Sequence, residues 1–268
     1  MRGAFQAGFI SEFVKIYPYI VIDRVYGTSV GAIMAPVIMD NRYDDLVEMY
    51  SSFKAPTDVF TPWSLIEAKL PQASLMLRGS AYKSVGIIDK VTAGTPAAVY
   101  DKCYCAAWDL TKKKTKWFTG TNYIEGMRAS SALPMAVPPY KMGESQMIDG
   151  YIDALIPLDL IKQHLSVRYD DSPVIVLIVD CSTRRFKIMD EPPKNVFSLM
   201  AEVASDATLA NCLNKLDRDF TEMGVPVLHI KPANVAFNSA MDFDETKISA
   251  SIVDGVNMAR SLLLRQYL

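Results

Sequence analysis

The sequence has few of the side chains from which metal sites and disulfide frameworks are built. It contains two histidines, His164 and His229, and four cysteines, no two of which have C-x-x-C spacing. A zinc site therefore has little support. We expect neither a metal nor a cofactor, and we interpret the cysteines as free buried thiols: Cys103, Cys105, Cys181 and Cys212.

The sequence also lacks an excess of charge and any long apolar run. Its 28 basic and 30 acidic side chains give a formal net charge of −2, which argues against a nucleic-acid partner. Apolar runs such as residues 174–179 are far shorter than the ~20 residues that span a bilayer. Gln6 and Glu12 interrupt the first apolar segment, so we find no export signal. We expect a cytoplasmic protein, soluble or in peripheral contact with a membrane.

Length and hydrophobic pattern indicate one α/β domain over residues 1–268, of which 50% are hydrophobic. Apolar strands alternate with amphipathic helices, which favours a mainly parallel sheet covered on both faces. The apolar residues of segment 54–100 show neither a clear helical nor a clear strand period, and we interpret this segment as a cap or helical insertion. The predicted strands are 20–26, 102–108, 115–119, 145–148, 174–180 and 225–230, and the predicted helices are 4–17, 32–39, 43–53, 121–131, 195–217 and 245–266.

The segment Gly27-Thr28-Ser29-Val30-Gly31 lies between a predicted strand and a predicted helix. Glycines two positions either side of a serine remove the Cβ atoms that would collide in a sharp strand-to-helix turn. The following helix directs free N–H groups toward the hydroxyl and favours an oxyanion there. The motif predicts Ser29 as a nucleophile, although an ordinary strand-to-helix turn is the alternative interpretation.

A nucleophilic serine needs a base, and the residues offer three candidates. His229 lies within an alternating strand pattern, and His164 lies at a polar helix end. Asp149 ends a predicted strand and precedes Gly150, so its carboxylate can lie at a turn beside the sheet edge. Asp-Gly is also a common turn signal.

Three separated stretches resemble the patatin-like phospholipases in order and spacing. Residues 2–8 resemble the second half of that family's glycine-rich oxyanion segment, and residues 27–31 resemble its nucleophile motif. Residues 128–134, followed by Asp149-Gly150, resemble the A-S-x-A-x-P helix end and the D-G motif. Ile156-Pro157 resembles the proline-containing entry that follows. Together the matches cover about 160 residues.

This resemblance implies a three-layer α/β/α fold and a Ser-Asp dyad that hydrolyses lipid or ester substrates through an acyl-enzyme. Carried onto this sequence, the resemblance implies that Ser29 attacks the acyl carbonyl and that Asp149 accepts and returns the proton. It also implies that backbone amides at Arg2, Gly3 and Val30 form the oxyanion hole. The scarcity of histidine is consistent with such a dyad.

Two features depart from the family pattern. The family has further glycines and a strand before the position of Arg2, whereas this chain begins at Met1, so we expect part of the oxyanion hole to be missing. Losing one oxyanion donor costs about 3 kcal/mol. Tyr151 stands where the family has a small residue, and we expect its phenol to narrow the acyl pocket.

The sequence leaves two other functions open. One is a Ser-His-Asp esterase or thioesterase that uses His229 or His164. The other is a catalytically silent patatin-like domain that binds lipid or a protein. A further basic cluster at residues 112–116, next to Trp117 and Phe118, fits a solvated hairpin turn, with contact to anionic headgroups as the alternative.

Overall fold

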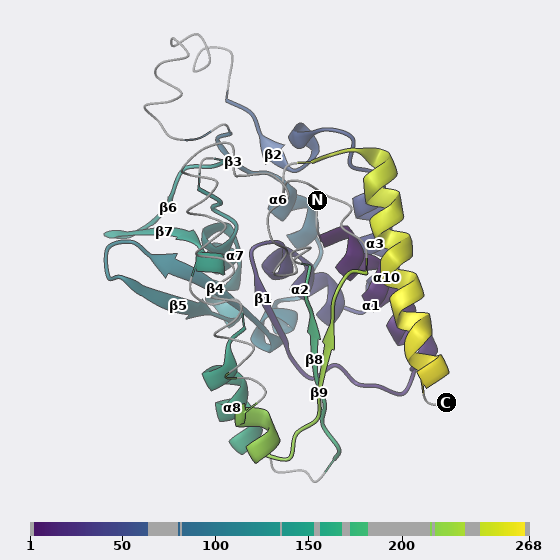
Figure 1. The fold of residues 1–268 in the computed structure, drawn as a ribbon. Coiled ribbons are helices and arrows are strands. Elements are labelled where there is room, and N and C mark those ends of the chain that lie inside the picture. Colours follow the sequence, from purple (N-terminus) through teal and green to yellow (C-terminus); the bar gives the residue numbers. More distant parts are fainter. Residues whose placement is uncertain are drawn as a thin grey trace, which may run out of the picture.

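The fold is taken from a computed structural model of the chain. Described here are residues 3–63, 80, 82–134, 136–152, 156–167, 172–181, 215, 218–233 and 242–265. Helices and strands are mixed along the chain, and the predicted α/β class is confirmed (Figure 1).

The main sheet has β4 (Cys103–Asp109) at its centre. β1 (Val25–Thr28) pairs parallel with the first half of β4, and β7 (Ser145–Asp149) pairs antiparallel with its second half. β5 (Lys114–Phe118) and β6 (Tyr140–Met142) are antiparallel to β4 and β7, respectively. We expected a mainly parallel sheet, but this one is mixed, because short hairpin turns cannot join parallel strands.

Two smaller strand pairs complete the described sheets. β8 (Val176–Val179) and β9 (Val227–Ile230) are parallel, with Val176 opposite Val227. β2 (Phe60–Thr61) and β3 (Ser84–Val85) are antiparallel. The short 3-10 helices are η1 (Pro56–Asp58), η2 (Ala97–Lys102), η3 (Gly120–Asn122) and η4 (Gly150–Ile152).

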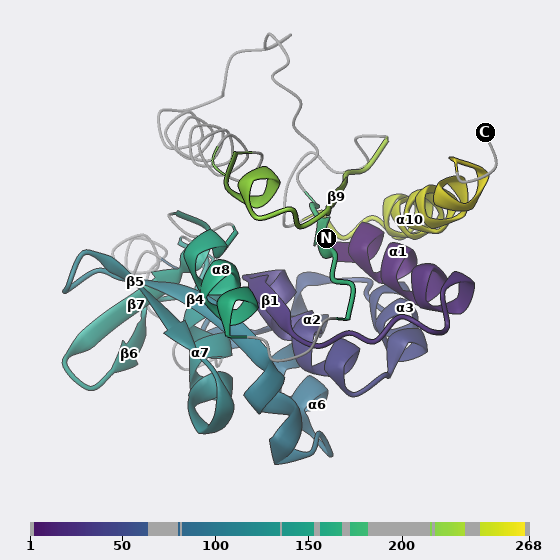
Figure 2. The same cartoon turned by 90° about the horizontal axis from the view of Figure 1, so that it is seen from below.

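Helices cover both faces of the main sheet. The Cys105 thiol points to the carbonyl of Tyr123 in α7 (Tyr123–Ser130), whereas the neighbouring Tyr104 ring packs against His164 in α8 (Leu158–Ser166). Successive side chains of a strand point to opposite faces. α7 and α8 therefore form the outer layers, as Figure 2 shows.

The first and last described helices pack side by side (Figures 1 and 2). α1 (Gly3–Ile16) and α10 (Glu245–Arg265) approach closely at Gly8 and Gly255, where an added Cβ would lie 2.2 Å from a backbone oxygen of the other helix. Ile248 and Ile252 of α10 are buried in the core. None of the helices in the described ranges is long and apolar enough to cross a membrane.

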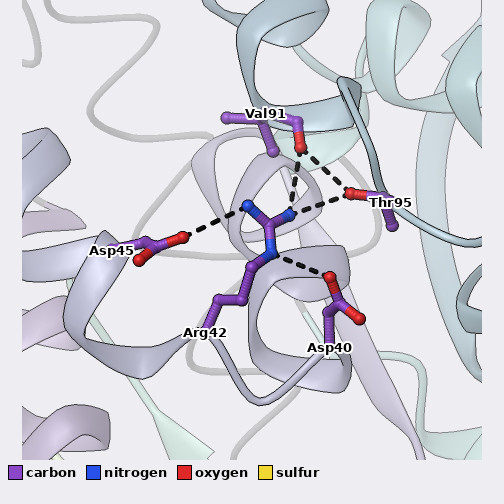
Figure 3. A network of polar contacts seen from close by, with 5 residues as sticks. All are labelled: Asp40, Arg42, Asp45, Val91 and Thr95. Carbon is purple, nitrogen blue, oxygen red and sulfur yellow. Dashed lines mark hydrogen bonds and ion pairs between the residues drawn. The ribbon is translucent and has the colours of Figure 1, made fainter.

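Arg42 joins three helices through its guanidinium group (Figure 3). It lies between α2 (Val30–Met39) and α3 (Tyr43–Ser51), and its Nε donates to Asp40 at 2.8 Å. Its terminal nitrogens donate to Asp45, to the Val91 carbonyl of α6 (Ile87–Thr92) and to the Thr95 hydroxyl. Because α2 begins directly after Ser29, this contact fixes the far end of the helix that follows the predicted nucleophile.

Three predicted segments differ from the described structure or lie partly outside it. The strand predicted at 20–26 begins only at Val25. The segment before it crosses the surface after α1 instead of entering the sheet, and Tyr19 and Val21 are therefore 95% and 86% exposed. The predicted insertion at 54–100 contains η1, β2, β3, α6 and η2, but residues 64–79 and 81 lie outside the described ranges. Most of the predicted helix 195–217 lies outside them too.

Replacing Arg42 by lysine should destabilise the protein, although the charge is kept. Lysine has no planar fork and cannot hold Asp40, Thr95 and the Val91 carbonyl at once. We expect the free energy of unfolding to fall by about 1–2 kcal/mol in urea denaturation. As a control, Lys15→Ala removes an ion pair with Asp44 whose side chains are 55% and 78% exposed. It should cost less than ~0.5 kcal/mol, and an equal loss in both variants would contradict this prediction.

Candidate active site

Ser29 lies where β1 turns abruptly into α2, and it is half-buried. Its backbone has φ 57° and ψ −121°, a conformation that residues with a side chain rarely adopt. Such strain costs about 1–3 kcal/mol and persists only when surrounding contacts hold it. The turn thus has the strained strand-to-helix geometry that is typical of a nucleophilic serine.

The two motif glycines are not equivalent. A Cβ on Gly27 would lie 2.2 Å from the Gly31 oxygen, so glycine is required there for α2 to turn back over β1. A Cβ on Gly31 would meet no atom within 4 Å. The steric reason predicted for Gly31 is therefore wrong, because the crowding falls on Gly27 alone.

Asp149 ends β7 and is 1% exposed. Its Oδ1 accepts a hydrogen bond from the Tyr151 N–H at 3.0 Å. Its Oδ2 is buried and has no hydrogen bond of standard geometry to any described residue. A buried carboxylate oxygen without a donor is costly, which makes Oδ2 a ready proton acceptor.

Burial raises the pKa of Asp149 from 3.8 to about 6. Interaction with the Ser29 side chain and the Tyr151 N–H opposes this rise. The Ser29 hydroxyl thus lies near enough to affect the carboxyl group, without closing a standard hydrogen bond to Oδ2. Catalytic hydrogen bonds are often loose before substrate binds.

The end of α7 holds both residues in place. The Ser29 N–H donates to Oγ of the fully buried Ser130 at 2.9 Å, and the Ser131 hydroxyl lies 3.5 Å from the Ser29 carbonyl oxygen. One residue later, the Ala132 carbonyl accepts the Asp149 N–H at 3.0 Å. We call residues 130–132 the bracket. These residues lie within the motif at 128–134, but the motif did not predict their positioning role.

Neither histidine lies at this site. The His164 Nδ1 shares a 2.6 Å hydrogen bond with the Tyr26 hydroxyl on the α8 side of the sheet, and burial lowers its pKa. The His229 Nε2 is 3.6 Å from Asp180 Oδ2, beyond hydrogen-bond distance. Within the described ranges, neither ring makes a hydrogen bond or ion pair with Ser29 or Asp149.

Two of the predicted oxyanion residues are neighbours in space. Gly3 begins α1, Val30 begins α2, and a Cβ on Gly3 would lie 2.8 Å from Val30 Cγ2. The described start of α1 therefore packs against the first residue of α2, directly after Ser29. Arg2 lies outside the described residues.

The end of β7 also requires Gly150, where a Cβ would lie 2.3 Å from the Ala106 oxygen of β4. Tyr151 follows and is half-buried, and its N–H holds Asp149. The effect of its phenol on an acyl pocket stays a prediction. Cavities of about 350 and 360 Å³ lie beside α3, and neither is lined by Ser29 or Asp149. The described residues contain no group of three side chains that could hold a metal.

A comparison with protein families bears on this arrangement. The family model for patatin-like phospholipase matches residues 1–161, which is 161 of the 268 residues. The chain belongs to the patatin-like phospholipase family. Patatin-like proteins are generally esterases and phospholipases, within the superfamily of lipid acyl hydrolases. A search of curated protein sequences gave no match to this patatin-like chain. The matched region runs from α1 into α8 and includes Gly3, Ser29, the bracket and Asp149.

Replacing Ser130 by alanine should loosen the Ser29 turn of this patatin-like protein. The Ser29 N–H would lose its buried acceptor, which costs about 1–3 kcal/mol of unfolding free energy. We also expect labelling of Ser29 by a fluorophosphonate to slow at least about tenfold, because the hydroxyl is less well aimed. Ser251→Ala removes another buried serine, on α10, and should leave the labelling rate unchanged. Equal labelling rates in the two variants would contradict the positioning role of the bracket.

Asp149→Asn should stabilise the protein at neutral pH but not in acid. Because the pKa of Asp149 is higher folded than unfolded, the folded state holds its proton longer, and wild-type stability falls as the pH rises from about 4 to about 6. The neutral amide avoids this loss of about 2–3 kcal/mol. Denaturation of both proteins at pH 3.5 and 7.5 measures the difference.

Asp109→Asn provides a control of opposite sign. Asp109 is also 1% exposed, and burial raises its pKa, but hydrogen bonds from Lys112, Ser145 and Thr111 outweigh that effect and lower it overall. This variant should be less stable than wild type at pH 7.5. Stabilisation by both substitutions, or by neither, would contradict the assignment of Asp149 as a carboxyl with a raised pKa.

Proposed function

We propose that this protein is a serine carboxylic ester hydrolase acting on lipid acyl esters, of the phospholipase A or lipid acyl hydrolase type. The observation that carries the proposal is the buried, unpartnered Oδ2 of Asp149 beside the strained Ser29 turn, with one bracket joined to both residues. Membership of a family of esterases and phospholipases supports the substrate class.

In the proposed acylation, Ser29 Oγ attacks the acyl carbonyl carbon and Asp149 Oδ2 takes the hydroxyl proton. The N–H groups at the starts of α1 and α2, including those of Gly3 and Val30, stabilise the negative oxygen of the tetrahedral intermediate. When the carbon–oxygen bond to the leaving group breaks, Asp149 returns the proton to the leaving alcohol. The acyl group stays on Ser29 as an ester.

Deacylation repeats these steps with water as the nucleophile. Asp149 takes a proton from the water, and the intermediate collapses to release the fatty acid and restore the Ser29 hydroxyl. A carboxyl with a pKa of about 6 suits this exchange, because it is mainly ionised at pH 7 and is a stronger base than an ordinary aspartate. The dyad needs neither histidine.

The proposal is tested by hydrolysis of short-chain nitrophenyl esters and a phospholipid panel. Ser29→Ala and Asp149→Asn should each lower kcat/KM by at least about 1000-fold, because the nucleophile and its base act together. A fluorophosphonate probe should label wild type and not Ser29→Ala.

Two histidine variants are the matched controls. His164→Gln and His229→Gln should keep activity within about threefold, because neither ring contacts the dyad. Loss of activity in either variant would favour a Ser-His-Asp triad. A folded protein that neither reacts with the probe nor hydrolyses any ester would be a silent lipid- or protein-binding domain, contrary to the proposal.

A further inference from the structure

Two hairpins project side by side from the main sheet (Figures 1 and 2). One joins β4 to β5 and the other joins β6 to β7. The Leu110 N–H donates to the Gln146 carbonyl at 2.8 Å, and the Gln146 N–H donates to the Thr111 hydroxyl at 3.2 Å. These hydrogen bonds hold the β4–β5 turn against the start of β7.

The hairpin tips are strongly basic. Residues 110–116 and 140–146 carry one exposed carboxylate, Glu144, and five exposed lysines: Lys112, Lys113, Lys114, Lys116 and Lys141. The Lys116 ammonium lies over the Phe118 ring, 4.9 Å from its centre. We call Lys112, Lys113, Lys114 and Lys116 the lysine hairpin. The whole chain has a formal net charge of −2, so this excess of positive charge is local.

The turn that presents these lysines is ordered. The buried carboxylate of Asp109 accepts the N–H groups of Thr111 and Lys112 at 2.9 and 3.0 Å. Lys113 has φ 53°, as a tight turn requires. Because the backbone is already fixed, little backbone entropy is lost when the hairpin meets a charged surface.

The lysine hairpin also lies on the catalytic side of the sheet. β1 and β4 run parallel with Thr28 opposite Ala106, and Ser29 follows at that edge. β4 continues to Asp109 before it turns, three residues further on, or about 10 Å at ~3.3 Å per residue. The lysines therefore extend beyond Ser29 in the direction in which β1 points.

We propose that the lysine hairpin docks on the anionic surface of a membrane. Each lysine near such a surface strengthens binding by a factor of about five at low salt. Because the net charge of the chain is negative, attraction requires that the lysine hairpin itself meets the surface, and docking through it fixes the orientation of the molecule. Docking would present the Ser29 edge of the sheet to lipid, and this consequence rests on the proposed lipid hydrolysis. The docking itself is independent of that proposal.

The test is co-sedimentation with vesicles of phosphatidylcholine alone or with 30% phosphatidylglycerol, in about 50 mM salt. Ser29→Ala protein is used throughout, so that no lipid is hydrolysed. Adding Lys112→Gln, Lys113→Gln and Lys114→Gln should weaken binding to the anionic vesicles roughly 100-fold. Raising the salt to about 0.5 M should weaken the binding of the Ser29→Ala parent protein.

A matched triple, Lys54→Gln, Lys90→Gln and Lys102→Gln, removes the same charge from exposed positions on other elements and should weaken binding less than about threefold. Equal losses in both triples, undiminished binding in the hairpin triple, or equal binding to neutral vesicles would overturn the proposal. So would tighter binding to a DNA duplex than to anionic vesicles.

Hydrolysis of a soluble short-chain ester separates docking from catalysis. With Ser29 restored, the hairpin triple should hydrolyse the ester like wild type and anionic vesicles more slowly. If wild type binds anionic vesicles through the lysines but hydrolyses no ester, docking stands and the proposed function fails. If the ester is hydrolysed but the lysines do not affect vesicle binding, the proposed function stands and the docking proposal fails.

Discussion

The hydrogen bond from the Ser29 N–H to Ser130 Oγ is the contact on which the site depends. The Ser29 backbone is strained, and a strained turn relaxes unless its neighbours oppose it. Ser130 is fully buried at the end of α7, and the Tyr123 hydroxyl at the start of that helix donates to the Ala32 carbonyl of α2 at 2.7 Å. α7 therefore holds both the turn and the helix that follows it.

The same bracket determines where the carboxylate lies. The Ala132 carbonyl accepts the Asp149 N–H, so a displacement of α7 relative to the sheet would move Ser29 and Asp149 together. Asp149 is buried at this position, and its Oδ2 has no hydrogen-bond donor among the described residues. Burial therefore destabilises the charged form of Asp149 beside Ser29. A buried carboxylate with a raised pKa is more typical of functional sites than of structural cores.

The parts of this arrangement that are local in sequence could be predicted from the residues alone. The Ser29 turn, the Asp149-Gly150 strand end and the β4–β5 hairpin each depend on residues within a few positions of one another. The role of Ser130 could not be predicted, because its partner is 101 residues away and a buried serine looks like any other small residue. The late start of β1 was missed because its apolar approach, Tyr19 to Ile22, has the composition of a buried strand.

The Ser29 turn, Asp149 and the lysine hairpin are all connected to the central strand β4. One edge of this strand pairs with β1 and then with β7, so Ser29 and Asp149 come from strands that follow each other along the same edge. Its other edge pairs with β5, and the turn between β4 and β5 carries the lysines. Cys105, Ala106 and Ala107 in its middle are fully buried, and a larger side chain there would separate layers that must touch. The spacing between Ser29, Asp149 and the basic tip is therefore set by the register of a single central strand.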